Sequence, residues 1–129
     1  MKKLLLILLC LPMIGFGQGW EKTFGGIGNE FGSSVQQTID GGYIITGTRN
    51  YSFSNGPANG LSDVYLIKTN GNGDSIWTKT LGGTSWVDGR SIQQTSDEGY
   101  IITGGRSYSG NEDLYLIKSD KNGDSLWSK

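Results

Sequence analysis

Short apolar runs alternate with clusters of glycine, asparagine, serine and aspartate along most of the chain. Two of these runs, Tyr43-Ile44-Ile45 and Val64-Tyr65-Leu66-Ile67, are only three and four residues long, and no helical periodicity follows the N-terminal segment. Short β-rich runs between turn residues are typical of an all-β protein. Continuous apolar runs, in place of strict alternation, indicate strands that are buried on both faces. We therefore expect an all-β fold.

One motif occurs twice and organises the rest of the chain. Residues 34–47 return 57 positions later as residues 91–104, and a tryptophan recurs beside each copy as Trp20, Trp77 and Trp127. A period of about 50 residues indicates a propeller or an array of repeats. Within the region 18–129 we therefore distinguish a first repeat at 20–76, a second at 77–126 and the start of a third at 127–129. The recurring tryptophans are expected to pack between repeats.

Each copy predicts four strands. The first three are expected at Ser33–Thr38, Tyr43–Thr48 and Asp63–Thr69 in one copy, and at Arg90–Thr95, Tyr100–Gly104 and Asp113–Ser119 in the other; the fourth carries Trp77 and ends at Gly82-Gly83. The first strand is expected to turn at Asp40-Gly41 in one copy and around Asp97-Glu98-Gly99 in the other, and the third strand turns through an Asn-Gly dipeptide in both copies. Asp-Gly and Asn-Gly supply the positive φ angles of tight hairpins. Residues 20–24 match a fourth strand without its own first three. We expect them to complete the sheet of residues 90–119, in competition with residues 124–129.

The motif G-x-x-x-x-G-x-S-φ-x-x-x-x-D-G-G-Y-φ-φ-T-G, followed by D-φ-φ-φ-φ-K and N-G-D-x-x-W-x-K-T-φ-G-G (φ apolar), resembles bacterial secreted β-propeller repeats. The matching positions include Gly32, Ser34, Asp40, Gly41, Gly42, Tyr43, Thr46, Gly47, Asp63, Lys68, Asn72, Gly73, Asp74, Trp77, Lys79, Thr80, Gly82 and Gly83. The resemblance implies four-stranded antiparallel up-and-down blades, here about two blades of an incomplete ring, and it implies export. It brings no catalytic residues. Two alternatives stay open: a fragment of a larger propeller protein, or a short chain that assembles a ring from several copies.

The N-terminus has the layout of a secretory signal peptide. Lys2 and Lys3 precede an apolar run over residues 4–11, and Gly15-Phe16-Gly17 follows as a cleavage site. We therefore expect residues 1–17 to be removed and the protein to be secreted or displayed at the cell surface. A lipoprotein signal at Cys10 is disfavoured because Leu9, and not a small residue, precedes it.

Composition narrows the classes of function. Of the 11 basic residues two lie in the leader, which leaves 9 against 12 acidic residues, and the processed chain contains no cysteine and no histidine. This mildly acidic balance argues against nucleic acid as a partner, and no polybasic or amphipathic helical segment suggests a membrane surface. Because the usual general base and thiol nucleophile are absent, we expect a protein that is not an enzyme and needs no cofactor.

A weak calcium motif occurs near the C-terminus. Asp120, Asn122 and Asp124 place three oxygen-bearing side chains at alternate positions, as calcium loops do. Side chains of this type also bond to their own turn backbone, which explains the pattern without a metal. We therefore expect no metal site.

Candidate binding residues lie at the end of the repeats opposite the tight turns. Two long loops are expected there, at residues 49–62 and 105–112, and loops on a rigid scaffold often carry binding residues. Trp86 is an exception to the repeat, because Asn29 stands at its place in the first copy; we expect an exposed side chain. The candidate residues are Trp86, Asp88, Arg90, Arg49, Tyr51, Arg106 and Tyr108.

These observations favour a non-catalytic exported module that binds a glycan or protein, or serves as a surface scaffold. The alternative is a non-catalytic part of a secreted carbohydrate-active enzyme. Two blades alone would leave apolar faces and strand edges uncovered, which is an association hazard. We therefore expect the chain to associate with itself to complete a ring.

Overall fold

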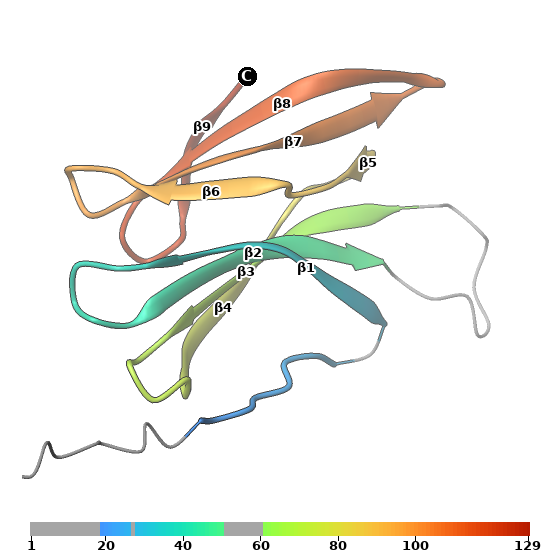
Figure 1. Ribbon diagram of the computed structural model, residues 1–129. Helices are drawn as coiled ribbons and strands as arrows, with labels where there is room; N and C mark the ends of the chain where they lie inside the picture. Colours follow the sequence, from blue (N-terminus) through green and yellow to red (C-terminus); the bar gives the residue numbers. More distant parts are fainter. Residues whose placement is uncertain (1–18, 27, 51–60) are drawn as a thin grey trace, which may run out of the picture.

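The computed structural model describes residues 19–26, 28–50 and 61–129, which form strands and turns without a helix (Figure 1). The predicted signal peptide lies outside these residues, and no helix within them is long and apolar enough to cross a membrane. The strands are β1 (Asn29–Gln37), β2 (Tyr43–Asn50), β3 (Ser62–Thr69), β4 (Ser75–Leu81), β5 (Trp86–Val87), β6 (Ser91–Gln94), β7 (Tyr100–Tyr108), β8 (Asn111–Ser119) and β9 (Ser125–Ser128). The predicted all-β class is confirmed.

The strands form two antiparallel meanders that belong to one mixed sheet. In the first meander β1, β2, β3 and β4 pair in chain order. In the second, β5 and β6 both lie along β7, which pairs with β8, and β8 pairs with β9. A single parallel pairing of Ser62 with Trp86 joins the two meanders. The chain thus builds a four-stranded meander twice, and in the second meander the first strand is divided into β5 and β6.

Turn chemistry explains where the strands end. Gly41 and Glu98 adopt positive φ angles of 80° and 63° in the first turn of each meander, and Gly73 and Gly123 adopt 80° and 81° in the last. The turns at Gly41, Gly73 and Gly123 follow from Asp-Gly and Asn-Gly dipeptides, which tolerate this conformation, whereas in the second copy Glu98 adopts it without a glycine.

The prediction of a long loop over residues 105–112 is wrong. Strands β7 and β8 continue through it and meet at a two-residue turn, in which Ser109 and Gly110 have φ angles of 53° and 90°. Two positive φ angles match the twist of the flanking strands, so the hairpin extends to its tip. Arg106 and Tyr108 consequently lie on β7. The other predicted loop, residues 49–62, lies mostly outside the described residues.

The two meanders stack face to face, and the core lies between them (Figure 1). We call this contact surface the inner junction. The first meander contributes Ile44, Val64 and Leu66, and the second contributes Val87, Ile92, Tyr100, Ile102 and Ile117. All eight side chains are buried, so most of the hydrophobic stabilisation of this fold comes from stacking.

The outer faces of the stack are open. Strand β3 is buried over nearly its whole length, as predicted, whereas the first four residues of β8 are exposed. Val64 is 0% exposed and its sequence counterpart Leu114 is 76% exposed; Ile92 is 3% exposed and its counterpart Val35 is 62% exposed. The prediction of strands buried on both faces therefore fails for β8, because no layer formed by the described residues covers its outer side.

Residues 20–24 do not complete the second meander. Strand β9 occupies that place, pairing Trp127 with Lys118 and Ser128 with Ile117. The segment instead crosses the outer face of the first meander, where the Trp20 and Tyr43 rings lie 5.9 Å apart. The sequence-based expectation for this segment is wrong, since the chain fills the fourth position of the second meander from its own C-terminal side.

Candidate functional site

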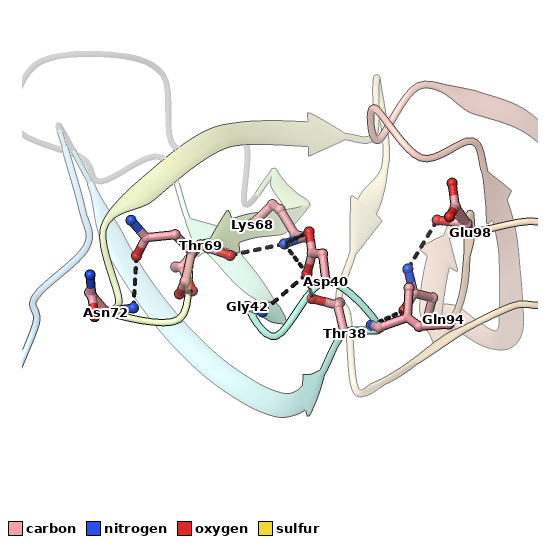
Figure 2. Close-up of polar contacts among 10 residues, drawn as sticks. Thr38, Asp40, Gly42, Lys68, Thr69, Asn72, Gln94 and Glu98 are labelled. Atoms are coloured by element: carbon pink, nitrogen blue, oxygen red, sulfur yellow. Dashed lines mark hydrogen bonds and ion pairs between the residues drawn. The ribbon is translucent and has the colours of Figure 1, made fainter. Parts of the chain in front are cut away.

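A polar network closes the tight-turn end of the first meander (Figure 2). The Lys68 ammonium lies 2.9 Å from Asp40 Oδ2 and donates to the Thr69 carbonyl at 2.9 Å. The Asp40 carboxylate also accepts from the Thr38 hydroxyl and, at 3.0 Å, from the Gly42 amide. The Lys68 side chain is only 5% exposed, and a buried ammonium needs such a counter-charge.

The second meander builds the same network from Thr95, Asp97 and Lys118. Donation from Lys68, then from Thr38, lowers the pKa of Asp40 to about 2. Donation from Thr95, then from Lys118, lowers the pKa of Asp97 to about 2. Both carboxylates are therefore ionised near neutral pH, and the two networks hold the turns in place.

Glutamine side chains tie the two turn ends together. The backbone amide of Gln94 donates to Gln36 Oε1 at 2.6 Å, and the side-chain oxygen Gln94 Oε1 accepts from the backbone amide of Ile39 at 2.9 Å. The Gln94 side chain also donates to the Glu98 carbonyl at 3.3 Å, as Figure 2 shows. The polar rim of the inner junction is thereby satisfied across the two meanders.

At the opposite end, Arg90 is held by two carboxylates. Its Nε donates to Asp88 Oδ2 at 2.8 Å, and its Nη2 donates to Glu112. Both contacts raise the pKa of Arg90, the one to Asp88 first. The Asp88 carboxylate also accepts from the Gly105 amide. The structure brings together the predicted residues Asp88 and Arg90, and it adds Glu112, which reaches them from β8.

Arg49 and Arg106 occupy the same place in the two sequence copies, and both stack on a tyrosine. Arg49 lies 5.3 Å from the Tyr65 ring centre and Arg106 lies 5.5 Å from that of Tyr115. Arg49 is also paired with Glu30 at 3.1 Å. Because both copies share the stacking, it is a structural contact of the motif near the ends of β2 and β7.

The remaining predicted binding residues are Trp86, Tyr108 and Tyr51. Trp86 is partly buried on β5, where its backbone pairs with Ser107 and Ser62, so the expectation of an exposed tryptophan is wrong. Tyr108 is 70% exposed near the tip of the β7–β8 hairpin. Tyr51 lies outside the described residues. Of the six predicted residues that the structure describes, Asp88 and Arg90 are in direct contact.

The Asp120–Asp124 turn is closed by its own side chains. Asp120 Oδ1 accepts from the amides of Asn122 and Asp124, each at 2.9 Å, and Asp124 pairs with Lys79 at 2.6 Å. Asn70 makes the same two contacts in the first copy. Among residues 19–26, 28–50 and 61–129, no group of three or more acidic, histidine or cysteine side chains could hold a metal ion. The hydrogen bonds explain the motif as a backbone turn.

An apolar groove of about 690 Å³ lies on the outer face of the first meander. Its apolar lining consists of Trp20, Phe24, Val35, Tyr43 and Ile45. The candidate residues predicted from the sequence do not include this groove, although the repeat of the motif indicates an apolar face there. Val35 is the counterpart of Ile92, which is buried in the second meander. The same apolar face is therefore expected on the first meander.

No family model matches the chain, and no curated protein matches it.

Proposed function

We propose that this chain is a non-catalytic exported module of the β-propeller type, in which each meander is a blade and function depends on stacking blades into a scaffold. The scaffold would present the end opposite the tight turns, which we call the loop end, to a glycan or protein at the cell surface or outside the cell. One observation carries the proposal: the same stacking contact occurs twice.

The first instance joins the two meanders. Trp77 of β4 lies edge-on to Tyr100, with ring centres 6.0 Å apart, and fits against Gly123, where a Cβ would lie 2.7 Å from the indole. Lys79, two residues further along, pairs with Asp124 at 2.6 Å. An aromatic wedge beside a glycine, fixed by an ion pair, connects one strand to the turn of the next meander.

The second instance lies on the outer face of the first meander. Trp20 lies against Tyr43 and Gly73, and Lys22 pairs with Asp74 at 2.8 Å. Residues 20–22 therefore contact the first meander as β4 contacts the second, although no sheet stands behind them. The contact belongs to the motif and not to one place in the chain, which supports a module made for stacking.

The charged side chains at the loop end favour a scaffold function and do not favour a catalytic site. Arg90 is paired with both Asp88 and Glu112, and Arg106 combines its tyrosine contact with a hydrogen bond to Ser85 at 3.1 Å. Their contacts are internal, so these groups position strands. Tyr108, which is 70% exposed on the same hairpin, is the side chain best placed to meet a ligand.

A covalent tandem tests the proposal. Joining Lys129 of one unit directly to Thr23 of the next continues the motif without interruption, because Trp127-Ser128-Lys129 then precedes Thr-Phe-Gly-Gly. If blades stack, the tandem should unfold in urea in a single transition with a higher midpoint than the single unit, since stability grows with each added interface. The proposal fails if the tandem unfolds at the midpoint of the single unit.

A further inference from the structure

We propose that the outer face of the first meander binds a second copy of this chain through the outer face of that copy's second meander. This inference rests on the proposed stacking function and specifies the partner and the contacts. The two outer faces are the sequence counterparts of the two surfaces that meet in the inner junction, so each contact inside the chain predicts one between chains.

The closest backbone approach in the inner junction occurs at Gly89. A Cβ on this residue would lie 2.9 Å from Val64 Cγ1 and 2.8 Å from the Gly47 carbonyl oxygen, and it would also collide with the Thr46 hydroxyl. Glycine is therefore required at this position because the first meander presses directly against its backbone.

The counterparts of these residues are open. Gly32, which stands at the place of Gly89, has no atom within 4 Å of a Cβ built on it. Leu114, which stands at the place of Val64, is 76% exposed, and Thr103 replaces Thr46 on the same face of the second meander. Head-to-tail docking places Leu114 and Thr103 of one copy over Gly32 of the next and buries two surfaces that are otherwise exposed.

The polar rim of the junction has open counterparts as well. Inside the chain, Gln94 bonds to Gln36 and to the Ile39 amide. The counterparts are Gln37, Gln93 and Ser96, and all three are exposed. Docking in the same register would pair Gln37 of one copy with Gln93 and Ser96 of the other.

At one place the two outer faces carry charged residues where the inner junction has uncharged ones. Glu30 and Glu112 stand where the inner junction has Val87 and Ser62, whose side chain donates to the Val87 carbonyl at 2.8 Å. Each carboxylate is paired with an arginine of its own meander, Glu30 with Arg49 and Glu112 with Arg90. The Glu30–Arg49 pair is neutral, whereas Arg90 is shared by Glu112 and Asp88, which leaves one net negative charge on the second face. Only one side of the contact is therefore charged, and like charges do not face each other across it.

Two tryptophans then compete for one position. Trp127 is the counterpart of Trp77, so in the docked pair it would lie on Tyr43 of the next copy, where Trp20 lies in the single chain. Strand β9 is hydrogen-bonded to β8, whereas residues 19–26 belong to no strand and Trp20 is 50% exposed. The segment without strand pairing yields more easily, so Trp127 displaces Trp20, and residues 20–24 act as an internal cover of the docking face.

The experiment measures association of the processed chain by sedimentation velocity over a range of micromolar concentrations. Wild-type protein should show a mass that rises with concentration, because a head-to-tail contact adds copies until a ring closes. Gly32→Leu, which blocks the first face, and Leu114→Lys, which blocks the second, should each remain single chains. Gly83→Leu is the matched control, since Gly83 also has no atom within 4 Å of its built Cβ and lies outside both faces.

Mixing the two blocked variants tests the direction of the contact. The Gly32→Leu chain retains the second face and the Leu114→Lys chain retains the first, so an equal mixture should form dimers and nothing larger. A mixture that stays monomeric overturns the proposal, as does a wild-type chain that stays monomeric at every concentration. If Gly32→Leu proves unfolded by thermal melt, then Val35→Lys, at a side chain that is 62% exposed, replaces it.

The tryptophans separate this docking from unspecific adhesion. Trp127→Ala should raise the dissociation constant by about tenfold or more, as loss of an aromatic anchor does. Trp20→Ala should leave it unchanged or lower it, since the competitor is removed; weakening equal to that of Trp127→Ala contradicts the proposal. A tandem that stacks together with a single chain that stays monomeric would overturn only the self-docking, whereas a tandem that does not stack would overturn the proposed function.

Discussion

Replacing Trp77 by alanine removes the side chain that joins the first meander to the second. Trp77 lies on β4, contacts the buried Tyr100 and fits against Gly123. The matched variant is Trp20→Ala, because Trp20 makes the same kind of contact to Tyr43 on the outer face. The two changes delete the same atoms from two equivalent sites.

The expected magnitudes differ because the two tryptophans are attached differently. Loss of about 150 Å² of burial at Trp77 corresponds, at ~25 cal/mol per Å², to about 4 kcal/mol as an upper limit, since the unfolded chain already buries part of this area. We therefore expect Trp77→Ala to lower the free energy of unfolding by about 3 kcal/mol. Trp20 is 50% exposed, and its loss frees residues 19–26, whose regained entropy offsets part of the cost. We expect a loss of about 1 kcal/mol or less for Trp20→Ala.

Urea unfolding followed by far-ultraviolet circular dichroism measures both values in dilute protein, where chains do not associate. Trp77→Ala should also broaden the transition, because the two meanders lose the contact that couples them. If Trp20→Ala lowers the free energy of unfolding as much as Trp77→Ala does, the inner junction is not the main source of stability. The stacking argument would then be refuted.

Three further predictions follow from individual sites. Asp40 has a folded-state pKa of about 2, below its value in the unfolded chain, so its ion pair stabilises the fold above pH ~4 and this contribution is lost as the pH falls toward 2. Asp40→Asn should lower the free energy of unfolding at neutral pH by about 1–3 kcal/mol, because it leaves the Lys68 ammonium, which is 5% exposed, without its counter-charge, and it should flatten the acid branch of the stability curve. Trp86→Ala should lower the melting temperature less than Trp77→Ala, because Trp77 packs against the buried core cluster and Trp86 does not belong to that set; an equal fall in melting temperature would assign Trp86 to the core. The exported protein should begin at Gln18, which its intact mass checks; a lipid on Cys10 would contradict this prediction.

Local chemistry decided much of the fold from the sequence alone. Asp-Gly and Asn-Gly dipeptides tolerate positive φ angles wherever they occur, so the turns at Gly41, Gly73 and Gly123 were predictable from a few neighbouring residues. The same holds for the all-β class and for the buried strand β3, because short apolar runs without helical period have few other solutions. The Ser109-Gly110 hairpin carried an equally local signal and was predictable in the same way.

Burial, by contrast, depends on what lies across the junction, and only the tertiary structure decided it. Val64 and Leu114 have the same place in the motif and the same local preference, yet one is fully buried and the other largely exposed, because a second meander covers only the first of them. The position of Trp20 and the approach of Glu112 to Arg90 likewise depend on which strands become neighbours. Two copies of one motif share their turns and strands, but a stack of two has one inner junction and two open faces.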